Sequence, residues 1–174
     1  MLKMKIQDWK RRIDRQFEAE IFDSVLIDGF KQTKEITNFE YCLEPEEIIE
    51  EVQEEPPVEE EEEERDFVVT MSKEMFDKYL NDDMNSRRAA FVNNYDKADN
   101  HCISYFHHYV RNNRYCMNVY VRSMNYKTNF VYDSQTFNLA YNKVFKSLSE
   151  KYKEIQKGFI RVFVFSMHIY IRGQ

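Results

Sequence analysis

The stretch HCISYFHHYVRNNRYCMNVYVRS, residues 101–123, decides the fold of this chain. Two runs rich in aromatic and β-branched residues flank Asn112 and Asn113, and asparagine tolerates the positive φ angles of a two-residue hairpin turn. The pattern therefore predicts a β-hairpin. A thiol, Cys102, stands at its start, and an anion-binding pair, Arg122 and Ser123, stands at its end. The hairpin thus indicates a nucleophile beside a phosphate site.

Composition limits the class of protein. The 174 residues, 16% of them aromatic, suffice for one domain with a sizeable core. Glycine and proline number three each, which argues against a glycine-rich phosphate loop. No apolar run approaches the roughly 20 residues that span a bilayer, and the N-terminus lacks an apolar signal core. We therefore expect a cytoplasmic protein without membrane contact, with Cys42, Cys102 and Cys116 as reduced thiols.

Charge is distributed unevenly along the chain. Residues 44–66 hold fourteen acidic residues and one basic residue, whereas residues 87–174 hold fourteen Lys or Arg and five Asp or Glu. The acidic run predicts a solvated, flexible linker, or else a segment that binds a basic protein partner. The basic part favours anionic ligands such as nucleotides. Exposed tyrosines on its strands would also suit single-stranded nucleic acid.

These patterns divide the chain into three segments: an N-terminal helical segment over 1–43, an acidic linker over 44–66 and a core over 67–174. Apolar residues at steps of three and four predict an amphipathic helix over 4–26, and residues 27–43 are ambiguous, with a short strand near 36–41 as one interpretation. In the core we expect strands at 67–71, 87–92 and 159–170, a short helix at 72–80, and a long helix from Ser134 to Gly158. The fold class is α+β.

The second half of the chain resembles thymidylate synthase and its relative, dCMP hydroxymethylase. Residues 106–110, FHHYV, resemble that family's FQFYV segment after the nucleophile, and residues 120–123, YVRS, resemble its YQRS. His168-Ile169-Tyr170 resembles a late H-x-Y. The separation of 20 positions from Cys102 to Arg122 needs no gap against the family pattern. The sequence departs from it at Ile103, where the family has a His, and shows no clear counterpart of the upstream catalytic Glu.

The resemblance implies a mixed sheet with one long core helix, a homodimer, and site residues that bind a pyrimidine deoxynucleotide. In the implied roles, Cys102 attacks C6 of the pyrimidine ring. Arg122 and Ser123 bind the phosphate, together with the partner subunit's Arg87 and Arg88. His168 and Tyr170 bind the sugar 3′-hydroxyl. Each also has a structural alternative: a buried thiol, a salt bridge, surface charge, or a His-Tyr pair within a sheet.

Asp133 stands where thymidylate synthase has the Asn that reads the uracil edge. A carboxylate offers acceptors only, which suits the exocyclic amine of cytosine and favours dCMP over dUMP. The alternative is an aspartate that satisfies free backbone N–H groups at a helix N-terminus just before Ser134.

Two functions are consistent with these residues. The first is a pyrimidine deoxynucleotide enzyme that transfers a one-carbon unit from methylenetetrahydrofolate to C5 of dCMP or dUMP. Because the family continues beyond the H-x-Y into folate-binding segments, we expect nucleotide binding to be the better preserved part. The second is a catalytically inactive fold, repurposed as in some viral genomes, that binds a protein partner through its acidic segment. Neither function involves a metal, since no ligand spacing for one is present.

Overall fold

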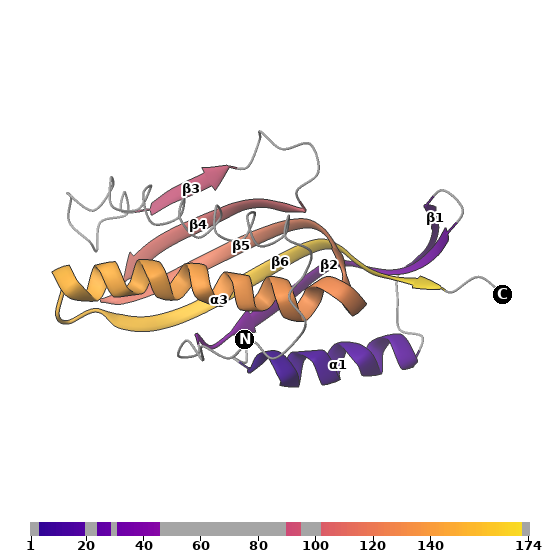
Figure 1. The fold of residues 1–174 in the computed structure, drawn as a ribbon, viewed down its shortest axis with the longest axis horizontal. Coiled ribbons are helices and arrows are strands. Elements are labelled where there is room, and N and C mark those ends of the chain that lie inside the picture. The colour runs from indigo at the N-terminus through magenta and orange to yellow at the C-terminus, as the bar shows by residue number, and fades with distance from the viewer. Residues whose placement is uncertain (1–3, 20–23, 29–30, 46–89, 95–101, 172–174) are drawn as a thin grey trace.

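The computed structural model describes residues 4–19, 24–28, 31–45, 90–94 and 102–171. These residues form one mixed sheet with two helices packed against it (Figure 1). The elements in chain order are α1 (Ile6–Glu18), β1 (Ser24–Asp28), β2 (Lys31–Leu43), β3 (Ala90–Asn94), β4 (Ile103–Arg111), β5 (Arg114–Asn125), α3 (Tyr126–Lys151) and β6 (Gln156–Ile171).

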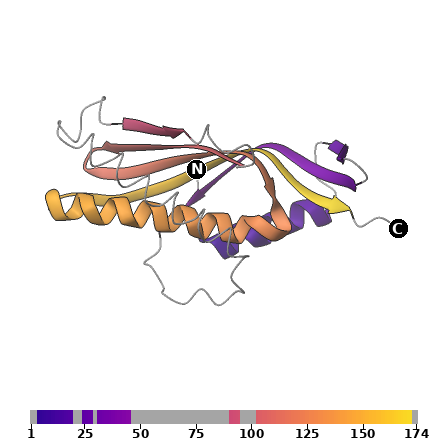
Figure 2. The ribbon, with the colours of Figure 1, turned by 45° about the horizontal axis from the view of Figure 1, so that its top comes forward.

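The sheet has six strands in the order β1-β2-β6-β5-β4-β3. All neighbours are antiparallel except β5 and β6, because α3 carries the chain back along the sheet between these two strands. Figure 2 shows α3 running along one side of the sheet. The predicted α+β class, with a mixed sheet and one long core helix, is confirmed.

The predicted hairpin is present. Asn112 and Asn113 have φ angles of 51° and 57°, so both adopt the left-handed conformation that a type I′ turn requires. Its two strands place consecutive histidines on opposite faces. His108 is fully buried against the Tyr115 hydroxyl, whereas His107 lies beside Asn118 on the face away from the helices. Within the described residues, no group of His, Cys, Asp or Glu could hold a metal ion.

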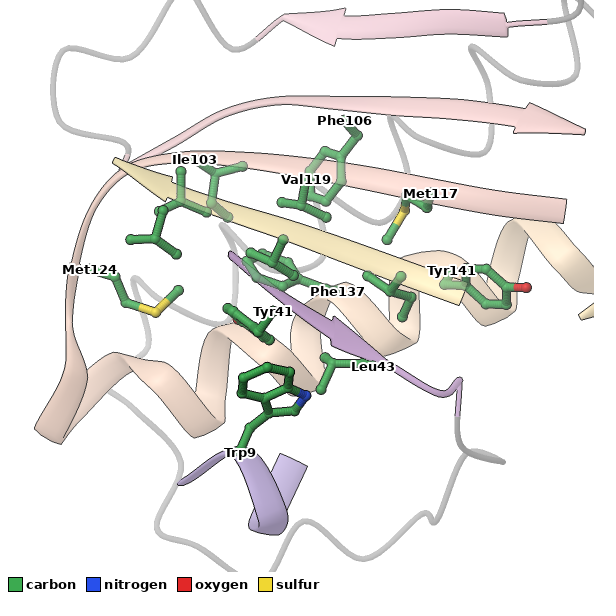
Figure 3. Close-up of a cluster of buried hydrophobic side chains, with 14 of the residues drawn as sticks. Trp9, Tyr41, Leu43, Ile103, Phe106, Met117, Val119, Met124, Phe137 and Tyr141 are labelled. Atoms are coloured by element: carbon green, nitrogen blue, oxygen red, sulfur yellow. The ribbon is translucent and has the colours of Figure 1, made fainter. Parts of the chain in front are cut away.

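The core lies between the sheet and its two helices. Trp9 of α1 packs on Tyr41 of β2 with ring centroids 5.9 Å apart, and its indole N–H donates to the Cys42 carbonyl at 2.8 Å. Tyr41 in turn packs on Phe130 of α3 at 5.2 Å. Figure 3 shows Trp9 pointing toward Tyr41 and Leu43. Because α1 and α3 both contact β2 residues of the core, they cover the same face.

The prediction for the long helix was wrong at both ends. The helix begins at Tyr126, where Asn125 caps it by accepting from the Lys127 amide at 3.2 Å, and it ends at Lys151. Ser134 is therefore an interior residue whose hydroxyl lies 3.0 Å from that of Tyr41. Gly158 lies in β6, where a Cβ atom would overlap the Tyr115 carbonyl oxygen and the Cys116 sulfur. It permits close strand approach and does not end the helix.

The predicted N-terminal helix was too long, since α1 ends at Glu18 and β1 begins at Ser24. The predicted strand near 36–41 is part of β2, which pairs with β6 through eleven residue pairs. Residues 31–43 thus lie in the same sheet as the predicted core, while the boundaries at 44 and 66 stay predictions. The elements expected at 67–71 and 72–80 lie outside the described residues. Neither described helix is long and apolar enough to cross a membrane.

Candidate functional site

In three neighbouring strands, the alternation of core-facing and outward-facing residues is interrupted at positions that pair with one another across the sheet. Residues that pack into the core alternate along each strand, but at this level they stand three positions apart. These are Val121 and Met124 in β5, Val164 and Met167 in β6, and Ile36 and Phe39 in β2. Two consecutive residues in each strand therefore leave the core, as at a β-bulge.

In β5 the two residues that leave the core are Arg122 and Ser123, the predicted phosphate pair. In β2 they are Thr37 and Asn38, and Asn38 has a φ angle of 51°. Asparagine adopts this conformation more readily than most residues, which explains its place at the irregularity. Local backbone structure thus directs an arginine and a serine, adjacent in sequence, away from the core.

The structure brings Ser123 and His168 together although they are 45 positions apart. Their Oγ and Nδ1 atoms are 3.3 Å apart, because β5 and β6 pair in parallel with Asn125 opposite His168. The rings of His168 and Tyr170 meet edge to face at 5.4 Å, and Tyr170 is 38% exposed. Residues that the resemblance assigns to phosphate and to sugar are thus neighbours on one surface.

Cys102 lies immediately before β4, and its carbonyl oxygen accepts a hydrogen bond of 2.7 Å from the Arg122 amide. The thiol-bearing residue and the predicted phosphate-binding residue are therefore linked through the backbone. Cys102 is half-buried, whereas Cys42 and Cys116 are buried. Ile103, which stands where the sequence resemblance would place a His, is buried in the core.

Arg122 is exposed, and it forms no ion pair with another described residue. An exposed guanidinium presents several N–H donors in a planar arrangement that can bind an anion. Arg87 and Arg88, predicted to reach the phosphate of the partner subunit, lie outside the described residues.

Asp133 does not cap a helix, which was the alternative to its role in reading the base. It is a buried residue in the interior of α3, seven positions beyond the first helical residue, and therefore not a helix cap. Its charge and the burial of Tyr41 both raise the pKa of the Tyr41 hydroxyl far above its usual value, burial being the larger cause. An electrostatic interaction thus joins Asp133 to Tyr41 in the core.

Comparison with solved structures identifies a similar fold. Thermostable thymidylate synthase A from Bacillus subtilis matches with a TM-score of 0.55 at 12% sequence identity, over 96% of this chain and 80% of that chain. The fold is thymidylate-synthase-like. No family model matches the sequence. No curated protein matches it either. At this identity, the likeness to thymidylate synthase shows the fold alone.

Sequence reasoning missed the contribution of β2 to this surface. Thr33 and Glu35 are buried polar residues opposite Tyr170 and His168, respectively. The available signal was the alternation of Thr33, Glu35 and Thr37 along one strand, which is typical of a face that does not enter the core. We define the polar surface as Arg122, Ser123, Asn125, His168, Tyr170, Thr33 and Glu35.

Proposed function

We propose that this protein binds a pyrimidine deoxynucleotide at the polar surface, as a divergent relative of thymidylate synthase. The observation that supports this most strongly is the 3.3 Å contact between Ser123 and His168. It joins two residues, 45 positions apart in the chain, that the resemblance had assigned to the same ligand. The exposed guanidinium of Arg122 supplies the charge that a phosphate needs.

Four members of the polar surface have a role in this proposal. Arg122 and the Ser123 hydroxyl donate to the phosphate, while the imidazole of His168 and the hydroxyl of Tyr170 bind the sugar 3′-hydroxyl. Asp133 keeps its predicted role of reading the base, which would favour dCMP, and its described interaction is with Tyr41. A homodimer in which Arg87 and Arg88 of one subunit reach the other's phosphate belongs to the same proposal.

The chemical step is a separate proposal. A thiolate at Cys102 would add to C6 of the pyrimidine ring and so activate C5. The donor implied by the resemblance is methylenetetrahydrofolate, which supplies a one-carbon unit when bound. The described residues include none that the resemblance assigns to a folate site, and Ile103 is a core residue where the family has a His. We therefore derive no step through the folate.

Calorimetric titration with dCMP and dUMP tests the binding site. We expect wild-type protein to bind at least one of them below millimolar concentration. Arg122→Ala should weaken binding by about 10- to 100-fold, since a charge-assisted hydrogen bond contributes roughly 1.5–3 kcal/mol. Arg114→Ala is a matched control, because Arg114 is an exposed arginine in the same strand, at the hairpin turn.

Failure of wild-type protein to bind either nucleotide would contradict the proposal. The repurposed fold, which binds a partner through residues 44–66, would then be the better account. If a nucleotide binds, release of tritium from C5 of the labelled nucleotide, with Cys102→Ser as control, tests the thiol chemistry.

A further inference from the structure

Two large exposed aromatic side chains stand on β6 on either side of His168. Among the described residues, the exposed large hydrophobic side chains are those of Val25, Phe165 and Tyr170. Phe165 is 52% exposed and Tyr170 is 38% exposed, whereas Val25 lies away from them on the edge strand β1. The proposed function uses Tyr170 and gives no role to Phe165, the more exposed of the two rings.

Phe165 lies beside the residues that we assign to the phosphate. Phe165 and Ser166 are the two consecutive residues of β6 that leave the core at its irregularity. Because β5 and β6 pair in parallel with Ser123 opposite Ser166, Arg122 is at the level of Phe165 on the neighbouring strand. Neighbouring strands are about 4.8 Å apart. An exposed ring, an exposed guanidinium and two hydroxyl groups therefore occupy adjacent positions of two strands.

The order of these residues along β6 matches the order of groups in a polynucleotide. His168, assigned to the sugar 3′-hydroxyl, contacts Ser123, assigned to the phosphate, at 3.3 Å. Ser166 lies two positions before His168, and Phe165 follows next in the same direction. At about 3.3 Å per residue, Phe165 is about 10 Å from His168 along the strand. A free 5′-nucleotide ends at its phosphate, whereas a nucleotide that carries another nucleoside on that phosphate extends toward Phe165.

An aromatic ring beside a cation suits single-stranded nucleic acid. Proteins that bind single strands stack the bases on aromatic side chains and bind the phosphates with Arg or Lys. The ring of Phe165 has no polar atom, so it gains most from an apolar, flat ligand such as the face of a base. The guanidinium of Arg122 complements the single negative charge of a phosphodiester.

We propose that this surface binds the 3′-terminal pyrimidine nucleotide of a single-stranded DNA, with the base of the preceding nucleotide stacked on Phe165. The phosphodiester lies at Arg122 and Ser123, with Ser166 as a second hydroxyl donor. The terminal sugar keeps a free 3′-hydroxyl, which is the group already assigned to His168. This inference deepens the proposed function, on which it rests for the places of the phosphate and the sugar.

Calorimetric titration with two matched ligands tests the inference. The first is the dinucleotide d(TpC), and the second is dCMP with its 5′-phosphate methylated. Both carry one negative charge and a free 3′-hydroxyl, but only the dinucleotide has a preceding base. We expect wild-type protein to bind the dinucleotide about 5- to 100-fold more tightly, the range for stacking of one base on an aromatic ring. The same pair of ligands with uracil in place of cytosine covers a preference for dUMP.

Variants assign that difference to the ring. Phe165→Ala should abolish the preference for the dinucleotide and leave the affinity for the methyl ester unchanged, whereas Phe165→Tyr should keep the preference. Val25→Ala is the matched control, because Val25 is an apolar residue of similar exposure, at 49%, on another strand. Ser166→Ala should weaken the binding of both ligands by about threefold to tenfold, as expected for a lost hydrogen bond.

The outcomes separate this inference from the proposed function. Equal wild-type affinities for the dinucleotide and the methyl ester would overturn the inference, and the proposed function would stand if dCMP or dUMP binds. Binding of the dinucleotide that depends on Phe165, without binding of either free nucleotide, would support the inference and contradict a site for free nucleotides. Failure of all these ligands to bind would overturn both. Equal affinities together with a monomeric Phe165→Ala would assign the ring to an interface between two copies of the chain.

Discussion

Two histidines of the sheet have opposite surroundings. His108 is fully buried, with its Nδ1 atom 2.7 Å from the Tyr115 hydroxyl, whereas His168 is partly exposed beside Ser123. Burial, and to a smaller extent the charge of His107, lowers the pKa of His108 to about 3. His108, which stays neutral throughout the physiological range, is part of the core, whereas His168 belongs to the proposed binding site.

The neutral state of His108 predicts a contribution to acid unfolding. Its pKa of about 3 lies below the ordinary 6.5, so the unfolded chain takes up a proton first as the pH falls. The contribution of neutral His108 to the free energy of unfolding is fully present above about pH 6.5. It is lost as the pH falls from there toward 3, by about 1.4 kcal/mol per pH unit. Urea unfolding at several pH values measures this slope.

His108→Gln should reduce the slope of the free energy of unfolding against pH between roughly pH 6 and pH 4. The reduction should correspond to about one fewer proton taken up on unfolding. His107→Gln should reduce it less, because His107 is only partly buried and its pKa is lowered less by burial. Equal slopes in His108→Gln and wild-type protein would mean that His108 is not buried in its neutral form.

At the scale of elements, the close approach of β5 and β6 depends on Gly158. A methyl group there would overlap the Tyr115 carbonyl oxygen, which also accepts a hydrogen bond of 2.8 Å from Tyr141. The Gly158 amide itself donates to the Tyr141 hydroxyl at 2.8 Å. Any larger residue must therefore separate two strands and disturb a buried pair of hydrogen bonds.

Gly158→Ala should lower the free energy of unfolding by about 1–3 kcal/mol, the usual cost of overpacking. Urea denaturation measures it, with Lys157→Ala as the neighbouring control, since Lys157 is only half-buried. A Gly158→Ala midpoint equal to that of wild type would show that the strands can separate at no cost.

Local patterns predicted some elements and not others. The hairpin was predictable from Asn112 and Asn113, because its turn depends on those residues alone. The start of α3 was missed because Asp133 and Ser134 look like a cap, whereas the Ser134 hydroxyl is in fact used by Tyr41. The pairing of Glu35 with His168 depends on the register between β2 and β6, which are far apart in the chain, and no local pattern encodes such a register.

At the scale of the whole molecule, the face of the sheet away from the two described helices carries a row of stacked aromatic rings. Tyr120 lies 4.2 Å from Tyr105 and 4.7 Å from Phe163, measured between ring centroids. Both described helices lie on the other face. The proposed homodimer would bury this row between two sheets, as the resemblance to thymidylate synthase implies, and would bring the polar surfaces of two subunits near the interface.

We expect sedimentation equilibrium to give twice the chain mass of 21.3 kDa. Tyr120→Glu should convert the dimer to a monomer, because a carboxylate buried without a partner is costly. Lys146→Glu, on the exposed side of α3, makes a larger change in charge and should leave the dimer intact. A wild-type monomer, or a dimer that Tyr120→Glu does not affect, would contradict an interface at this face.

The central claim is that the polar surface binds a pyrimidine deoxynucleotide. NMR chemical-shift mapping tests this claim most directly. Backbone amide signals would be followed while dCMP or dUMP is added to millimolar concentration. The account predicts the largest shifts at residues 122–125 and 166–170, with little change at the hairpin turn, residues 111–114. Shifts that are absent from both nucleotide titrations, or that are confined to other parts of the described chain, would contradict it.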